Sequence, residues 1–126
     1  RTKSRTRLAM EAWMAEWAEY YDNDRVVIMQ IPRSLCLDYK ATEADVEELS
    51  SLAALVAGTD CGVTLRELEP GKVKISLRTG PRVNATKVCA LLGGGGHAAA
   101  AGATLSATLS EAKQAVLQAI DMVVGE

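Results

Sequence analysis

The sequence has no phenylalanine and only five aromatic residues among 126, so a surface that stacks many nucleic-acid bases is not expected. Its three cysteines, Cys36, Cys61 and Cys89, are odd in number and widely spaced. Neither a disulfide framework nor a C-x-x-C metal knuckle fits them, so we expect a protein of the reducing cytoplasm. No apolar run approaches the roughly 18 residues of a transmembrane helix, and no apolar segment follows the basic start, so neither a membrane partner nor a secretory signal is expected.

Acidic residues are missing from one long segment. The chain carries 14 basic and 16 acidic residues, a net charge of −2, but residues 71–110 hold five basic residues and no Asp or Glu. The rest of the chain therefore carries 9 basic and 16 acidic residues, a net charge of −7. A local positive field in an acidic protein favours a small or short anion over long duplex DNA. Chance composition in a segment rich in strand and glycine is the alternative.

Periodicity predicts a helix followed by a strand in the first third of the chain. Apolar residues recur at steps of three and four over residues 5–21, which predicts a helix with an acidic outer surface. Asp22-Asn23-Asp24 ends this pattern, and the β-branched run over residues 26–31, ended by Pro32, predicts a buried strand. The predicted apolar face of the helix comprises Leu8, Ala9, Ala12, Trp13, Trp17 and Tyr20.

Two further helices begin at capping boxes. The first is predicted to start at Thr42 and to end at Gly58, and the second to start at Thr108 and to end at Gly125. Between them, the turn signal around Gly71 separates two alternating segments and predicts a β-hairpin. Only an odd-length, bulged turn brings the apolar residues of both segments to one face. That register pairs Leu65 with Ile75, Val63 with Leu77, Arg66 with Lys74 and Thr64 with Ser76.

The C-terminal part holds the least common feature of the sequence. A short helix over residues 83–92, capped by Asn84 or Thr86, leads into the glycine run 93–96 and an Ala-rich strand over 97–105. The resulting order, α-β-α-β-β-α-β-α, predicts an α/β (mixed α+β) fold with a small mixed sheet of four to five strands and helices packed on it.

The four consecutive glycines have two readings, a flexible linker or a loop whose amides approach an anion. Because the run lies between a helix and an apolar strand and lacks Ser, Pro and charge, we favour the second. It precedes His97, the only histidine, which can donate a hydrogen bond to a phosphoryl oxygen. The Gly-Lys-Ser/Thr of a Walker loop is absent, and the helix and strand stand in the wrong order for a dinucleotide fingerprint. With no second histidine or nearby carboxylate, no metal site is expected here.

The segment GGGGHAAAAG resembles the Gly-Gly-Gly-His-x-x-Ala-Ala-Gly signature of the DHH-associated domain, the C-terminal half of the DHH phosphoesterases. The segment from Lys74 to Thr79 is similar to the Ser-x-Arg strand of that domain. The spacing through the helix over residues 83–92 resembles the nanoRNase and pAp phosphatase branch. The resemblance covers nearly the whole chain. It divides the chain into a linker with the N-terminal helix (residues 1–21) and a substrate-binding domain (residues 22–126).

The resemblance implies a division of labour. A preceding DHH domain, with its Asp-His-His motif and further aspartates, would hold two manganese ions and activate water. This chain lacks that motif, so we expect it to be one domain of a longer phosphoesterase, without catalytic groups or cofactor of its own. By position, Arg78 and His97 would grip a phosphate or base, with Ser76 assisting and backbone contacts from Gly93, Gly94, Gly95 and Gly96. Arg66 and Thr86 are added from the hairpin-face and capping arguments.

The expected partners are a short RNA, pAp or a cyclic dinucleotide, together with the DHH catalytic domain. One alternative function is an RNA-binding or oligomerising module of the kind appended to alanyl-tRNA synthetases. Another is a purely structural domain whose Trp-bearing helix packs on a partner. The oligomeric state is not readable from the sequence, and a homodimer stays open.

Overall fold

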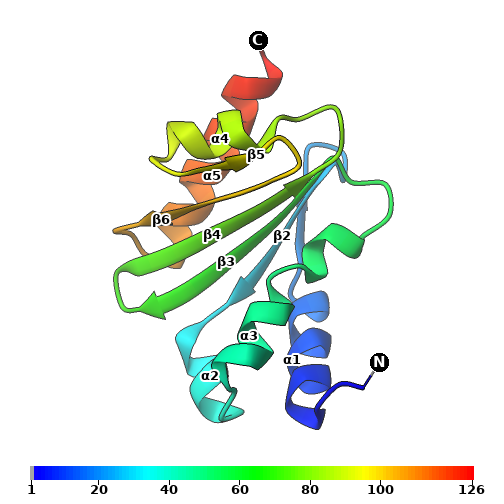
Figure 1. Cartoon of the computed structure of the whole chain (residues 1–126), viewed down its shortest axis with the longest axis vertical. Coiled ribbons are helices and arrows are strands. Elements are labelled where there is room, and N and C mark those ends of the chain that lie inside the picture. Colours follow the sequence, from blue (N-terminus) through cyan, green and yellow to red (C-terminus); the bar gives the residue numbers. More distant parts are fainter. Residues whose placement is uncertain (1) are drawn as a thin grey trace.

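The computed structural model describes residues 2–126, which form one six-stranded sheet with helices on both faces (Figure 1). Across the sheet the strands follow the order β1-β2-β3-β4-β6-β5. Strands β2 and β3 run parallel, and every other neighbouring pair runs antiparallel. The predicted mixed α+β class is confirmed, with six strands instead of four to five. Along the chain the elements are α1 (Arg5–Glu16), β1 (Glu19–Tyr21), β2 (Val26–Ile31), α2 (Arg33–Asp38), α3 (Glu43–Leu49), the 3₁₀ helix η1 (Leu52–Leu55), β3 (Cys61–Glu69), β4 (Lys72–Thr79), α4 (Ala85–Leu91), β5 (Gly95–His97), β6 (Ala100–Leu105) and α5 (Leu109–Val124).

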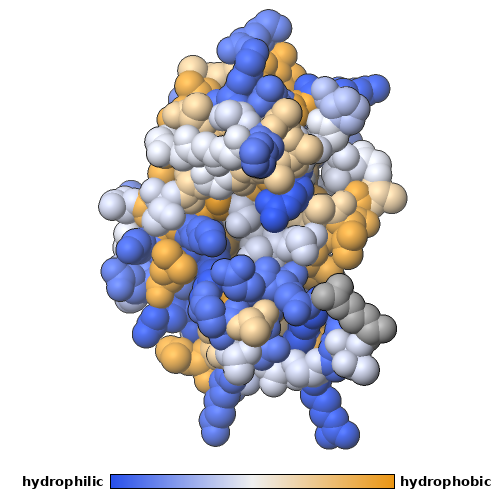
Figure 2. Space-filling model, viewed as in Figure 1, coloured by the Kyte–Doolittle hydropathy of each residue, from blue (hydrophilic) through white to orange (hydrophobic). Residues whose placement is uncertain are grey.

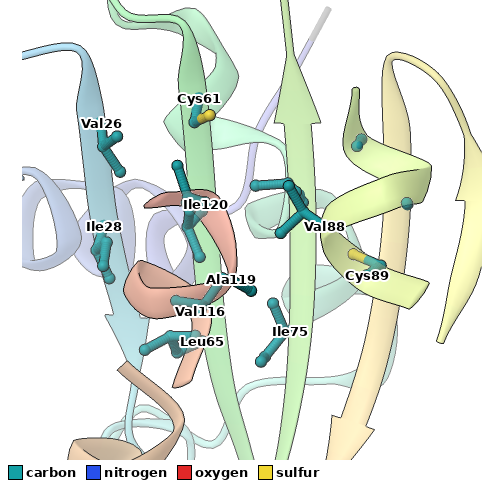
Figure 3. Close-up of a cluster of buried hydrophobic side chains, with 14 of the residues drawn as sticks. Val26, Ile28, Cys61, Leu65, Ile75, Val88, Cys89, Val116, Ala119 and Ile120 are labelled. Atoms are coloured by element: carbon teal, nitrogen blue, oxygen red, sulfur yellow. The ribbon is translucent and has the colours of Figure 1, made fainter. Parts of the chain in front are cut away.

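The two faces of the sheet are covered unequally. On one face, α4 and α5 pack on strands β2, β3, β4 and β6 and bury a continuous apolar cluster (Figure 3). On the other face, a second cluster joins α1, α2, α3 and η1 to strand β2, and η1 lies against β3. No buried residue of this second cluster comes from β4, β5 or β6 within residues 2–126. Those three strands therefore present an open surface, which faces the viewer in Figure 1. We call it the open face.

The N-terminal helix is shorter than predicted, and a different side of it is buried. Helix α1 ends at Glu16, and residues 19–21 form strand β1 through pairing with β2. The reversal between these strands uses left-handed backbone at Asp22, Asn23 and Asp24, which Asp and Asn tolerate better than most residues. The helix buries Met10 and Met14, while Leu8, Trp17 and Tyr20 of the predicted apolar face stay exposed. The apolar residues of this helix lie on several of its sides, so the periodicity alone predicted the wrong side to be buried.

The helix predicted from Thr42 to Gly58 is divided in two. Its capping box is confirmed, because the Thr42 hydroxyl accepts from the Asp45 amide and the Asp45 carboxylate accepts from the Thr42 amide. Helix α3 nevertheless ends at Leu49, where the Ser50 carbonyl accepts a 2.9 Å hydrogen bond from the Thr64 hydroxyl of β3. The chain continues as η1, which lies so close to β3 that a Cβ on Gly62 would meet the Ala53 carbonyl oxygen at 2.7 Å.

The predicted hairpin register is confirmed. Leu65 pairs with Ile75, Val63 with Leu77, Arg66 with Lys74 and Thr64 with Ser76. The bulge lies between Glu67 and Glu69, so the reversal itself needs only Pro70 and Gly71, and Gly71 has the predicted left-handed backbone with a φ of 82°. The bulge supplies the odd residue that sends the apolar side chains of both strands toward α5.

The C-terminal helices agree with the sequence, but the glycine run does not form the predicted loop. Helix α4 is capped by Asn84, and α5 has the Thr108 and Glu111 capping box and ends at Gly125. The single strand predicted over residues 97–105 is instead a hairpin, in which β5 pairs with β6 across a turn at residues 98–99. The last two glycines thus lie in an edge strand. No helix within residues 2–126 is both long and apolar enough to cross a bilayer.

Candidate anion-binding site

The site begins with the alternation along β4. Val73, Ile75 and Leu77 are fully buried in the cluster under α4 and α5. The residues between them, Lys74, Ser76 and Arg78, are only partly buried and project to the open face. The strand therefore presents apolar side chains to the core on one face of the sheet, and cationic and hydroxyl side chains on the other face.

Strand pairing places Arg78 and His97 in one row. Arg78 lies opposite Ala100 of β6, and Ala100 lies opposite His97 of β5. Residues directly opposite each other in antiparallel strands project to the same face, so all three side chains belong to the open face. The Arg78 and His97 Cα atoms are two strand spacings apart, about 10 Å. Because the residue between them is only alanine, an anion has room to contact both side chains.

Backbone hydrogen bonds hold the tip of the β5–β6 hairpin against β4 and α4. The Thr79 amide donates to the Ala99 carbonyl at 2.9 Å, and the Thr79 hydroxyl donates to the Ala98 carbonyl at 3.0 Å. The Ala85 amide, in the first turn of α4, donates to the same Ala98 carbonyl at 2.8 Å. His97 directly precedes this tip, so these bonds set the position of its backbone relative to Arg78.

The four glycines divide into two pairs. The Gly93 and Gly94 amides donate to the Ala90 and Cys89 carbonyls at the end of α4, so these two amides already have partners. Gly95 and Gly96 lie in β5, at the edge of the sheet. Gly95 lies opposite Gly102, which lies opposite Ser76. The open face therefore carries no bulky side chain along this second row.

The cations on the open face and on the neighbouring strand β3 differ in their partners. The Arg78 guanidinium makes one 3.4 Å hydrogen bond, to the Leu77 carbonyl, and has no carboxylate partner within residues 2–126. Arg66, by contrast, donates two hydrogen bonds of 2.8 and 2.7 Å to the Glu43 carboxylate. Those bonds lower the pKa of Glu43 and raise the pKa of Arg66. The charge of Arg66 is thus compensated, and that of Arg78 is not.

The structure brings together some of the predicted site residues and separates others. Arg78, His97, Ser76 and Gly95 share the open face, whereas Thr86 lies on α4, which packs on the opposite face of the sheet. One open-face cation, Lys74, is absent from the predicted set, although the alternation along residues 74–78 could have indicated it. A hollow of about 240 Å³ adjoins the row and is lined in part by Gly62, Arg78, Thr79 and Gly80, together with the acidic residue Asp60.

Residues 2–126 do not supply a metal centre. Within that range, no three His, Cys, Asp or Glu side chains gather closely enough to hold a metal ion. The family resemblance implies the two manganese ions for a preceding DHH domain, and the described residues of this chain contain no cluster that could hold them. What the open face provides is hydrogen-bond donors and positive charge.

Comparison with known proteins identifies the family. A profile of the DHHA1 domain matches residues 23–126, which includes every strand of the sheet except β1. The chain belongs to the DHHA1 domain family. The resemblance to the DHH-associated domain, drawn from the glycine–histidine motif, is thereby confirmed.

Related proteins are considerably longer than this chain. The bifunctional oligoribonuclease and PAP phosphatase of Thermus thermophilus is 42% identical over 79 residues, which cover 62% of this chain and 24% of that protein. An exopolyphosphatase-related protein from Bacteroides fragilis has the same fold, with a TM-score of 0.87 and 22% identity over 98% of this chain and 36% of its own. A pGpG-specific phosphodiesterase from Vibrio cholerae superposes with a TM-score of 0.60 and 10% identity over 96% of this chain and 40% of its own. The chain thus spans about a quarter to two fifths of these proteins.

Proposed function

We propose that this DHHA1 chain holds a phosphate of a short oligoribonucleotide or of pAp on its open face, for hydrolysis by a DHH catalytic domain. The row Arg78–Ala100–His97 carries the proposal. A guanidinium without a carboxylate partner can donate two parallel hydrogen bonds to a phosphate, and a neutral imidazole can donate a third. The 42% identity to an oligoribonuclease and PAP phosphatase supports this choice of substrate.

The proposal assigns binding to this chain and chemistry to another domain. Manganese ions would be held by carboxylates and histidines of the DHH catalytic domain, since the described residues contain no such cluster. When bound there, the metals would activate water for attack on the phosphoester. The open face would fix the substrate, and the row of Ser76, Gly102 and Gly95 would leave room for it to lie flat. A cytoplasmic location remains our prediction from the cysteine pattern.

The first test is a titration of this chain with pAp, followed by calorimetry and by amide NMR shifts. We expect binding with shifts confined to β4, β5 and the turn at residues 98–99. Arg78→Ala and His97→Ala should each weaken binding by about tenfold or more, because a hydrogen bond to a charged group contributes about 1.5 to 3 kcal/mol. The amide spectrum of each variant should otherwise keep its dispersion, since neither side chain is fully buried.

Lys87→Gln is the matched control. Lys87 is an exposed cation on α4, which packs on the face of the sheet opposite Arg78, so its removal changes the net charge without touching the row. Equal loss of binding in Lys87→Gln and Arg78→Ala would mean that only net charge matters and would contradict the proposal. Absence of pAp binding at millimolar concentration would also contradict it, and tight binding of structured tRNA instead would favour the RNA-module alternative.

A further inference from the structure

The open face carries positive charge toward both ends of β4, and the exposed Lys72, at the start of the strand, lies two residues before Lys74 in the same alternation. One position is the row of Arg78 and His97. The other lies four residues earlier, where Lys74 stands between Arg66 on β3 and Thr104 on β6. The row between them contains Ser76, Gly102 and Gly95 and has no charge. Along β4 the open face therefore presents a cationic row, then an uncharged row of small residues, and then a second cationic row.

Lys74 is an open-face cation without a hydrogen-bonded carboxylate partner within residues 2–126. It lies directly opposite Arg66, whose own charge is compensated by Glu43. The nearby Glu43 carboxylate is held by both terminal nitrogens of Arg66. Lys74 contributes a smaller part to the lowered pKa of Glu43, but its ammonium forms no hydrogen bond or ion pair within residues 2–126. Its charge is left available for a bound anion.

The two cationic positions lie far enough apart along β4 to hold two separate anionic groups. Four residues of antiparallel strand separate the Lys74 and Arg78 Cα atoms by about 13 Å. Their side chains stand roughly perpendicular to the sheet, so their charged ends keep much of this separation. Two anionic groups joined by an uncharged spacer match this arrangement, and the glycines of the middle row leave space for that spacer.

We infer that Lys74 forms a second phosphate subsite and makes the open face selective for ligands with two phosphates separated by a nucleoside. This inference rests on the proposed function, which places the first phosphate at Arg78 and His97. A nucleoside 3′,5′-bisphosphate or the linked phosphates of a short oligoribonucleotide fit the description. A nucleoside monophosphate or inorganic phosphate occupies only one position. Arg66 serves to hold Glu43, and Lys74 contacts the ligand.

The test compares two ligands, pAp and 5′-AMP, on the intact chain and on the Lys74→Gln variant. We expect the intact chain to bind pAp more tightly than 5′-AMP. Lys74→Gln should weaken pAp binding by about fivefold, which corresponds to about 1 kcal/mol, the upper range for a solvent-accessible ion pair. Its affinity for 5′-AMP should stay unchanged, since that ligand does not reach Lys74. Lys87→Gln, which removes the same charge elsewhere, should leave both affinities as they are.

The two proposals fail in different ways in this experiment. If Arg78→Ala leaves 5′-AMP and pAp binding unchanged, the proposed function is wrong and the inference falls with it. Suppose instead that Arg78→Ala weakens the binding of both ligands, while Lys74→Gln weakens the binding of both equally or of neither. The proposed function then stands, and the second subsite is wrong. Lys74 is only partly buried, so its replacement is not expected to unfold the chain, and the amide spectrum of the variant verifies this.

Discussion

Neighbouring glycines of the run 93–96 have different structural roles, although they look equivalent in the sequence. A Cβ on Gly94 would lie 2.0 Å from the Gly102 carbonyl oxygen and 2.7 Å from the Ala103 Cβ. A Cβ on Gly95 would meet nothing within 4 Å and would project onto the open face beside Gly102. Gly94 therefore permits close packing of the hairpin, whereas Gly95 keeps the surface of the proposed site free.

Substitution by alanine should separate these two duties. Gly94→Ala should destabilise the chain by about 1 to 3 kcal/mol, because a backbone carbonyl must move to admit the methyl group. Gly95→Ala should leave stability within about 0.5 kcal/mol or raise it slightly, since the position is open and the unfolded chain loses entropy. Thermal and urea unfolding measure both.

Ligand affinity supplies the second half of this comparison. Gly95→Ala should weaken pAp binding while the melting temperature is preserved, because the methyl group intrudes between the two cationic rows. If Gly95→Ala binds pAp as well as the unmodified chain does, the ligand does not lie over the middle row. If Gly94→Ala is as stable as Gly95→Ala, the close approach of Gly94 to β6 is relieved at no cost.

Among the secondary-structure elements, α5 is held at its start by a reciprocal pair of hydrogen bonds. The Thr108 hydroxyl accepts from the Glu111 amide at 3.1 Å, and the Glu111 carboxylate accepts from the Thr108 amide at 2.9 Å. The second bond favours the ionised carboxylate and lowers the pKa of Glu111 from its ordinary value of 4.5. Stability from this group is therefore fully present above pH 4.5 and is lost as the pH falls through the lowered pKa.

Two variants should separate the cap from its titration. Thr108→Ala should destabilise the chain by about 1 kcal/mol at neutral pH, through loss of the hydroxyl acceptor. Glu111→Gln keeps an oxygen that accepts from the Thr108 amide but no longer titrates. Its unfolding free energy should therefore fall less steeply than that of the unmodified chain when urea unfolding is repeated from pH 6 down to pH 3. Equal slopes would mean that the cap is already broken in the native state.

Elements with local signals were predictable, and elements fixed by distant contacts were not. The α5 cap, the β2 boundaries and the β3–β4 register all depend on residues close together in the sequence. Strand β1 depends on pairing with β2, and α3 ends where Thr64 of β3 binds the Ser50 carbonyl, 14 residues away. No periodicity within the helix could indicate that partner.

The candidate site shows the same division. The motif indicated Arg78 and His97, and alternation along β4 placed Ser76 on their face. The pairing of Arg66 with Glu43, 23 residues earlier, follows from where α3 lies on the sheet and left no trace in the sequence. Thr86 was chosen as a capping residue, but Asn84 forms the cap and α4 lies on the far side of the sheet from Arg78.

Across the whole molecule, the helices cover the strands of the sheet unequally, so we expect the strands to differ in their local stability. Strand β3 has helices against both faces and paired strands on both sides, and β4 is paired on both sides over a fully buried apolar row. Strand β5 has three residues, all exposed, and one free edge. Figure 2 shows mostly pale residues of intermediate hydropathy over these strands, with isolated hydrophilic residues among them. The proposed site is therefore built at the least covered margin of the sheet.

Native-state hydrogen exchange should resolve this gradient. We expect the amides of Val63, Leu65 and Ile75 to exchange only through global unfolding, because opening them breaks the main core. The amides of β5 should exchange far faster, through local opening of the hairpin, and saturating pAp should slow them while leaving Leu65 at its global limit. This result would place ligand binding and local folding of the hairpin in one equilibrium. If β5 exchanges as slowly as Ile75 without ligand, the hairpin belongs to the cooperative core, and the site is rigid before the phosphate arrives.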